Sequence, residues 1–509
     1  MNIPFGAAAP RARQPAGRGR AGARTALALA ITLLAACTAT RGPELADAAP
    51  GLDARVGVEP GTVLRQTDER WDEPSAAWDG AAPLTPDAAV RCALANNRAL
   101  RRTLAEADRR RAAFGDAQLP PNPTLNVAVG APLDMGVVPV LATIAGQLDR
   151  LWKRDAIAGD AEAQLRSLLL EAGAMVAATV VEARTAYVEA ASSIEQASLA
   201  RADAEVAARV LAAERSAFDA GESTGSEVAR AEMNAAEASN RAMEAEVASI
   251  AAKTRLLESI GRGQLSLEWE TASRTAAEAE AACAIRAPEL PEADEALLAL
   301  VRERRLDVRA AEARVAAAEA RAALAAAGRI PTLLLGGGWE RDMEGDDAVM
   351  FMVESQLPIF NDGRYRVAAA MAEAEIARID ADRVWQRAVI DARRALADIA
   401  ATEHHLATLR TGTLAAFERS QGLLAQSVEA GERRAVELWR SQHQRNHILL
   451  QLARADRDRL LATLSFERAL AGGRLPSMQP SFGGSPAMGT GMGSPSMPDF
   501  GFTALETME

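Results

Sequence analysis

The sequence predicts a mainly α-helical protein with a small β part, built from long antiparallel helical hairpins of coiled-coil type and a few short strands. Three observations indicate this fold class. Of 509 residues, 49% are hydrophobic but only 4% are aromatic, so small aliphatic side chains supply most of the apolar surface. No proline occurs between Pro139 and Pro288 or between Pro358 and Pro476, and such spans exceed an ordinary globular helix. Finally, two parts of the chain repeat one another.

The N-terminus has the composition of a secretory signal. Arginines precede the apolar run ALALAITLLAA, no acidic residue occurs before Glu44, and the run is too short to span a bilayer. The run ends in LAAC at Cys37, which resembles the lipobox of bacterial lipoproteins, whose cysteine is acylated. We predict a lipoprotein signal peptide over 1–36 and a lipidated linker over 37–83. An ordinary signal with an incidental cysteine is the alternative.

A duplicated unit accounts for most of the chain. The segment from Asn96 to Gly130 aligns without gaps on the segment from Arg304 to Gly338, and both contain Pro-Thr-Leu at the same place. We therefore predict a first repeat over residues 84–285 and a second repeat over residues 286–473.

Each repeat begins with helix that ends at a proline-containing turn, because proline cannot continue a helix. Short apolar stretches follow, such as LNVAVG in the first repeat and VMFMVESQL in the second, with the β-branched residues and partial alternation of strands. These stretches predict one β-hairpin per repeat, at about 124–148 and at about 332–360.

Beyond each hairpin the chain is predicted to form long helix. The span from about Arg154 to Gly221 would be on the order of 100 Å long as a helix. Apolar residues recur along it every seventh position: Leu169, Val176, Ala183, Ala190, Ala197, Ala204, Leu211 and Phe218. At Gly221 the chain is expected to reverse into an antiparallel partner helix, with Ser223 and Ser226 as N-cap candidates. The similar sequence around Gly431 predicts a second helical hairpin.

This order of parts resembles the TolC outer-membrane efflux protein family, in its lipid-anchored branch. The resemblance covers roughly residues 84 to 473. In each repeat it rests on a turn motif and its hairpin, a motif that begins the long helix, an AGE tip and a return helix. The turn motifs are LPPNPTLNVAVG in the first repeat and GRIPTLLLGGG in the second, and the motifs that begin the long helix are LWKRDAIAGDAEAQL and LPIFNDGRYRVAAAMAEAEI. It implies a homotrimer in which each chain contributes four strands to a twelve-stranded outer-membrane β-barrel and its long helices to an α-barrel across the periplasm. Physics also favours the trimer, since an open sheet edge in lipid leaves backbone groups unsatisfied.

Proteins of this family are passive exit ducts of tripartite pumps. The resemblance therefore implies an efflux channel for small molecules or metal ions in the cell outer membrane, lipid-anchored and with a large periplasmic portion. Its expected partners are a periplasmic adaptor and an inner-membrane RND or ABC transporter. A type I protein-secretion duct is a second role for the same architecture. The alternative from another class is a periplasmic coiled-coil structural lipoprotein tethered at Cys37, which would need no strands.

The predicted strands contain few of the aromatic residues that usually flank a membrane barrel. The available candidates are Trp152, Trp339, Phe351, Phe360 and Tyr365.

The resemblance implies a function for the two helical tips. In the family the glycine-containing tips meet the adaptor, which corresponds here to Gly221 and Glu222 in the first repeat and to Gly431 and Glu432 in the second. Helix capping alone would also explain both glycines.

The resemblance also implies a periplasmic gate. The family often has acidic side chains past the second glycine, at the narrow end of the pore, and this chain has Glu437 there, with Arg440 where some members have a second acid. We predict that alternating salt bridges between Glu437 and Arg440 hold this end closed. The alternative is an ordinary solvated face of a charged helix.

Two pairs of residues are candidates for other chemistry. Cys92 and Cys283 have no metal-ligand spacing and either form a disulfide or remain isolated buried thiols. His443 and His447 have the i, i+4 spacing of a metal pair. The histidines on the other arm of the hairpin, at 404 and 405, are expected to lie roughly 20 Å away.

Several classes of function are not indicated. The net charge of -12 gives no reason to expect a nucleic acid partner. No nucleophile motif, phosphate loop or paired-carboxylate site stands out, so we expect no enzyme, no cofactor and no resident metal. Residues 474–509 are rich in Gly, Pro, Ser and Met and predict a disordered tail, with Cu(I) ligation by methionines as the alternative.

Overall fold

The fold is taken from a computed structural model, which describes residues 42–50, 52, 78, 80–130, 138–266, 268–285, 293–342, 345–434 and 436–471. These residues all belong to one compact unit, Met1–Gly473. The predictions for the signal peptide, Cys37, most of the linker and the tail fall outside the described residues and remain predictions.

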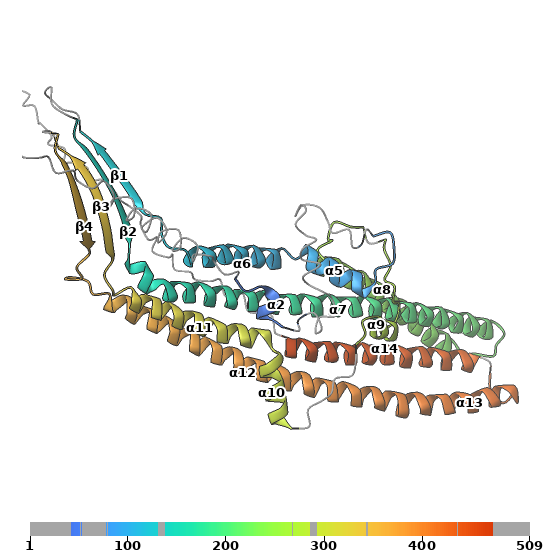
Figure 1. Cartoon of the computed structure of the whole chain (residues 1–509). Coiled ribbons are helices and arrows are strands. Elements are labelled where there is room, and N and C mark those ends of the chain that lie inside the picture. Colours follow the sequence, from blue (N-terminus) through green and yellow to red (C-terminus); the bar gives the residue numbers. More distant parts are fainter. Residues whose placement is uncertain are drawn as a thin grey trace, which may run out of the picture. The chain divides into compact units, whose positions relative to one another are not determined.

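The elements follow the predicted order twice (Figure 1). After a short helix α2 (Leu45–Ala48), the first repeat consists of α5 (Pro86–Asn96), α6 (Arg98–Ala117), β1 (Thr124–Val129), β2 (Val140–Gln147), α7 (Asp149–Asp219), α8 (Gly225–Ser259) and α9 (Ala276–Ala282). The second consists of α10 (Asp294–Arg304), α11 (Leu306–Ala327), β3 (Leu333–Arg341), β4 (Asp347–Ser355), α12 (Arg364–Thr408), the π-helical turn η2 (Leu409–Leu414), α13 (Ala415–Glu429) and α14 (Val436–Ala471). The mainly α-helical fold with four strands is therefore confirmed.

The two long outgoing helices differ. In the first repeat α7 is continuous over 71 residues. In the second repeat the π-helical turn η2 interrupts the helix between α12 and α13. Such turns insert an extra residue into the helical ladder and change which side chains face a neighbour.

The sheet and the helical tips lie at opposite ends of α7. Strand β2 ends at Gln147, directly before α7 begins at Asp149, and the chain reverses directly after α7 ends at Asp219. Figure 1 shows the same arrangement, with all four strands together at one end of the long helices.

The core is formed around α7, which packs against α8, α14, α11 and α6. By length and composition α7 is also the one described helix that could cross a membrane, but 67% of its most apolar window is buried inside the protein. Burial by neighbouring helices thus accounts for its apolar character.

The predicted seven-residue stripe is buried for only part of its length. It is buried from Leu169 to Ala197, whereas Phe218 near the tip is 49% exposed. Near the tip, Val210 and neighbouring residues on the same face of α7 are buried instead. The reason is that α7 packs between α8 and α14 here, where Val210, Ala231 and Val436 form a hydrophobic cluster. The prediction was wrong for this end because a sequence period does not reveal which helices surround it.

Candidate functional site

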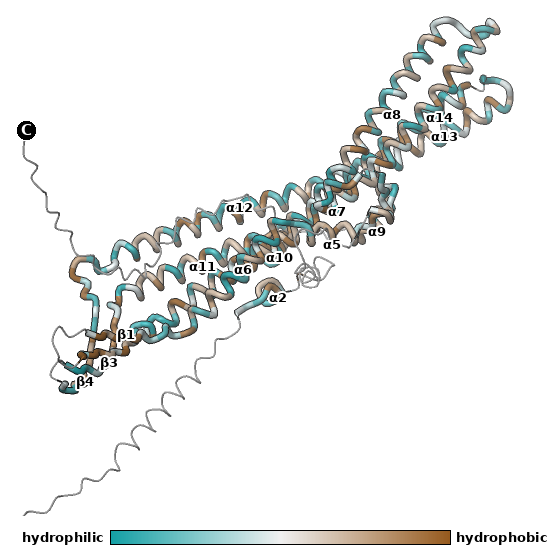
Figure 2. The backbone as a smooth tube through the Cα atoms, turned by 90° about the horizontal axis from the view of Figure 1, so that it is seen from above, coloured by the Kyte–Doolittle hydropathy of each residue, from teal (hydrophilic) through white to brown (hydrophobic). Residues whose placement is uncertain are grey.

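One face of the four-stranded sheet is apolar across all four strands, apart from the ion pair of Arg341 with Asp347 at one end. In the antiparallel order β1-β2-β3-β4, Leu125 pairs with Ile144, Ile144 with Gly337, and Gly337 with Phe351. Leu125 is 69% and Phe351 is 87% exposed. The register places further apolar residues on this face: Val127, Val129, Val140, Ala142, Leu335, Trp339, Val349 and Val353. Strands β1 and β3 accordingly colour as hydrophobic in Figure 2.

The opposite face of the sheet is more polar. Its side chains include Thr124, Asn126, Thr143, Gln147, Glu340 and Glu354. Alternation between an apolar and a polar face along each strand is typical of membrane β-barrels, where one face meets lipid and the other a lumen. In water, so large an exposed apolar face would instead invite aggregation.

The two outer strands of the sheet are β1 and β4, and neither outer edge pairs with another strand in the described part of the chain. The backbone groups of such an edge need partners if they are surrounded by lipid. The sheet thus has the properties of a segment of a larger barrel.

Exposed aromatic side chains lie where the strands give way to helices. Trp152 lies in the first turn of α7, Phe360 follows β4, and Tyr365 lies in the first turn of α12. Tryptophan and tyrosine favour the interface between a membrane and water. Two further candidates, Trp339 and Phe351, lie on the apolar face of the sheet itself.

The two helical tips have the same backbone geometry. Gly221 and Gly431 adopt φ of 76° and 74°, in the left-handed region that favours glycine. At each tip the next residue closes the turn: Glu222 N donates to Ala217 O at 2.8 Å, and Glu432 N donates to the carbonyl five residues before it at 2.9 Å. Both glycines therefore cap a helix. Helix capping alone accounts for their conformation, and docking of an adaptor at the tips is an additional proposal.

The first tip is capped by a residue other than the predicted serines. Thr224, with extended backbone, is the N-cap of α8, and it forms a capping box with Glu227. Ser226 already lies inside the helix, and the Ser223 hydroxyl donates to the carboxylates of Glu214 and Glu227 at 2.7 and 2.9 Å. The Thr224 backbone N–H and then the Ser223 hydroxyl lower the pKa of Glu227 to about 2.

The predicted gate residues are paired within one chain. Arg440 donates to Glu437 at 2.8 Å and, through its second guanidinium nitrogen, to Glu214 at 2.7 Å. Arg434 lies 3.8 Å from the same Glu214 carboxylate. The sequence interpretation missed Glu214, although it stands four residues after Val210 on the buried face of α7, where an acidic residue is unexpected.

The histidine pair is divided between two environments. His443 Nδ1 lies 2.6 Å from the buried carboxylate of Asp203, whereas His447 is exposed. Within the described ranges no cluster of three or more His, Cys, Asp or Glu side chains is arranged to hold a metal ion. His443 therefore joins α14 to α7 at a second point, three residues after Arg440 on α14 and eleven residues before Glu214 on α7.

The two cysteines of the described helices are free, buried thiols. Burial raises the pKa of both, and that of Cys283 reaches about 12. Of the two alternatives drawn from the sequence, the structure has isolated thiols and no disulfide.

Comparison with known proteins agrees with this geometry. Residues 297–472 match the family model described as outer membrane efflux protein. The second repeat is thus similar to outer membrane efflux proteins. The match lies in the second repeat, and the first repeat has the same order of elements. No curated protein matches the sequence.

Several solved structures share the fold of this chain. One is CusC, whose crystal structures are described in terms of conformational changes that accompany folding and transmembrane channel formation. CusC is 15% identical with a TM-score of 0.61, and the match covers 80% of this chain and 96% of CusC. The outer membrane protein VceC of Vibrio cholerae is 17% identical with a TM-score of 0.58, covering 79% of this chain and all of VceC. The open MtrE outer membrane channel of Neisseria gonorrhoeae is 19% identical with a TM-score of 0.57, covering 76% and 89%.

Proposed function

We propose that this protein is the passive outer-membrane channel of a tripartite efflux pump, through which small molecules or metal ions leave the cell. The observation that carries the proposal is the sheet, whose four strands combine one largely apolar face, one more polar face and two open edges. A segment of the wall of a water-filled membrane barrel needs an apolar face toward lipid, a polar face toward the lumen and edges that pair with further strands.

Closure of the barrel needs further copies of the chain. Four strands are too few for a membrane barrel, and each open edge must pair because lipid offers no hydrogen bonds. A homotrimer would join β4 of one copy to β1 of the next and give twelve strands.

The long helices support the same assembly. Helix α8 packs on α7, and it exposes a stripe of apolar side chains on its other side: Met233, Met243, Val247 and Ile250. An exposed apolar stripe on a long helix favours a partner helix. A neighbouring copy is the partner that would continue the wall of helices below the barrel.

The helical tips are proposed to dock a periplasmic adaptor, which in turn joins the channel to an inner-membrane RND or ABC transporter. Support comes from the equivalence of the two tips, since Gly221 and Gly431 share one backbone geometry and carry exposed Glu222 and Glu432 beside them. Three chains would present six similar tips to an adaptor ring.

The gate is proposed to include Glu437, Arg440 and, in addition, Glu214. Within one chain these groups link α14 to α7 close to the tips. Opening of the periplasmic end would require the second hairpin to move relative to the first, so this link would oppose opening. The bridges between copies predicted from the sequence would add to it.

The membrane anchor remains a proposal from the sequence. Acylation of Cys37 would hold the N-terminus on the outer membrane, consistent with a barrel in the same bilayer. If the protein were instead a structural lipoprotein of the periplasm, the exposed apolar face of the sheet would have no function. A type I secretion duct would use the same architecture and differs only in its cargo.

The proposal is tested on the purified full-length protein in detergent and in planar bilayers. We expect a trimeric mass and discrete single-channel conductance. A monomer that forms no conducting channel would favour the structural lipoprotein.

A further inference from the structure

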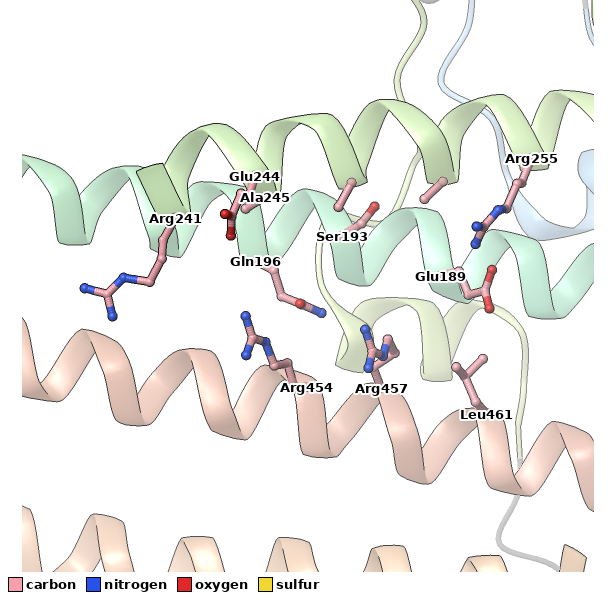
Figure 3. A pocket seen from close by; sticks show the side chains of 12 residues that line it. Glu189, Ser193, Gln196, Arg241, Glu244, Ala245, Arg255, Arg454, Arg457 and Leu461 are labelled. Atoms are coloured by element: carbon pink, nitrogen blue, oxygen red, sulfur yellow. The ribbon is translucent and has the colours of Figure 1, made fainter. Parts of the chain in front are cut away.

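A cavity of about 480 Å³ lies between α7, α8 and α14, well away from the tips and the sheet. Four of its lining residues are arginines and two are glutamates: Arg241, Arg255, Arg454, Arg457, Glu189 and Glu244. Figure 3 shows Arg454 and Arg457 extending from α14 toward Gln196 of α7, with Arg241 and Arg255 on α8 across from them. We call this cavity the arginine groove.

Several donors in the arginine groove lack acceptors. The side-chain nitrogen Nε2 of Gln196 and the Nε of Arg241 are buried and have no hydrogen-bond partner. Arg255 and Arg454 form no ion pair or hydrogen bond with any described residue, whereas Arg457 bonds Asp458. Buried donors normally find an acceptor, so Gln196 Nε2 and Arg241 Nε indicate an acceptor that the chain itself does not provide, whereas Arg255 and Arg454 are exposed to solvent at the groove.

The arginine groove opens on one side of the α7 and α14 layer, and α9 covers the other. Glu195 of α7 accepts from the backbone of Ala276 in α9, and Arg459 of α14 donates to Glu280 of α9. Ser193 and Arg457 line the groove, and each is two residues from the α9-facing residue of its own helix. At 3.6 residues per turn, two residues are about 160° apart around a helix.

Because the arginine groove and α9 lie on opposite sides of the layer formed by α7 and α14, the position of α9 determines whether the groove faces the inside or the outside of a channel. In a tube that conducts, α9 must lie outside, since a further layer inside would obstruct the passage. The groove on the opposite side then faces the lumen. Three copies would repeat it around the tube, and a charged cleft with low-dielectric walls concentrates ions of opposite sign.

We propose that the arginine groove is an anion-binding station on the inner wall of the channel, and that the exported cargo includes organic anions bearing a carboxylate, phosphate or sulfonate. This inference rests on the proposed channel function and narrows its cargo. Guanidinium groups bind such oxyanions through paired, charge-assisted hydrogen bonds, and the unpaired Arg255 and Arg454 are available for them. Gln196 would donate to the same ligand from the floor of the groove.

The experiment combines equilibrium binding with single-channel recording. Naphthalene-1,5-disulfonate serves as the probe anion, titrated by calorimetry into the detergent-solubilised full-length protein and added to the protein in planar bilayers. We expect saturable binding, brief blocks of the current, and a reversal potential in a KCl gradient that indicates preference for chloride. Substitution of both Arg255→Gln and Arg454→Gln is expected to weaken binding about tenfold or more and to reduce the chloride preference.

Two further variants separate a binding role from damage to the fold. Arg445→Gln removes an exposed arginine that lies on the α9-facing side of α14, fourteen residues before Arg459, and should change neither readout. Glu189→Gln removes a negative charge from the groove and should strengthen binding, an effect that misfolding would not produce.

The outcomes distinguish this inference from the proposed function. A conducting trimer that binds no probe, or binds it equally in the double variant, would overturn the inference and leave the channel in place. A protein that never conducts would overturn the channel and with it the placement of the groove in a lumen.

Discussion

The guanidinium of Arg440 lies 2.7 Å from the carboxylate of Glu214, a side chain with no exposure to solvent, and joins the second helical hairpin to the first. Arg440 reaches Glu214 across 226 positions of sequence. The pair links α14 to α7 near the tips, and Arg434, just before α14, lies 3.8 Å from the same carboxylate. Its position makes it the first place to test how the hairpins are held together.

Removal of the buried partner should loosen the tip. Glu214→Ala leaves two guanidinium groups without their buried carboxylate, which we expect to cost about 3 kcal/mol of local stability. Hydrogen exchange of the first turns of α14 would measure the loss. Glu232→Ala breaks the exposed bridge to Arg215 and should have little effect. Equal protection of α14 in both variants would exclude Glu214 as a link.

Opening of the proposed gate should follow loss of its charges. Replacement of Glu437 and Arg440 by alanine together should raise the open probability or the conductance in planar bilayers, because the link to α7 and any bridges between copies disappear. The exposed Arg445→Ala serves as the control on the same helix. Unchanged conductance in the double variant would assign Glu437 and Arg440 to an ordinary solvated helix face.

The capping box should make the first tip sensitive to acid. The pKa of Glu227 is lowered from 4.5 to about 2, so the carboxylate contributes stability above its unfolded pKa and loses it as the pH falls from 4.5 toward 2. The protection factors of the amides at the start of α8, which correct for the pH dependence of intrinsic hydrogen exchange, should therefore stay constant from pH 7 to 5 and decrease at lower pH. Thr224→Ala should cost about 1 kcal/mol at neutral pH, and Glu227→Gln should remove the acid dependence. Identical acid profiles in Glu227→Gln and the native protein would contradict this assignment.

Replacement of a tip glycine should lower the stability of the folded protein. No atom lies near the Cβ position of Gly221, so Gly221→Ala meets no clash and pays only for its positive φ, about 1 to 2 kcal/mol. Gly221→Asn should cost less because asparagine tolerates this conformation. Gly422→Ala, in the middle of α13 and equally free of clashes, should stabilise the helix by about 1 kcal/mol. Thermal unfolding would measure all three, and loss of stability in Gly422→Ala would undermine the comparison.

The cysteine thiols should be inert in the folded protein. Burial raises the pKa of Cys92 and of Cys283, so the reactive thiolate is scarce at pH 8. A colorimetric disulfide reagent should therefore titrate them only after unfolding, whereas a cysteine introduced at the exposed Ser226 should react at once. Rapid modification of the folded native protein would show that the surrounding helices open readily.

Much of the architecture follows from local patterns in the sequence. The proline-free spans predict the long helices, the alternating apolar stretches predict four strands, and the glycines at 221 and 431 predict the reversals, because each signal depends on residues a few positions apart. The repeat adds that both halves have one order of parts. The interpretation was less successful at the cap of α8, where three neighbouring hydroxyl residues compete and only the backbone conformation selects Thr224.

The sequence by itself determined the helices, the strands and their duplication, and thereby the fold class. Only the tertiary structure decided which side chains meet across the hairpins, including Glu214 with Arg440, Asp203 with His443, and the arginines of the groove. The physical reason is that helix and strand periodicity is a local property of the chain. A contact between α7 and α14 instead depends on the rotation of two helices that are more than two hundred residues apart in the sequence, and packing of all their neighbours sets that rotation.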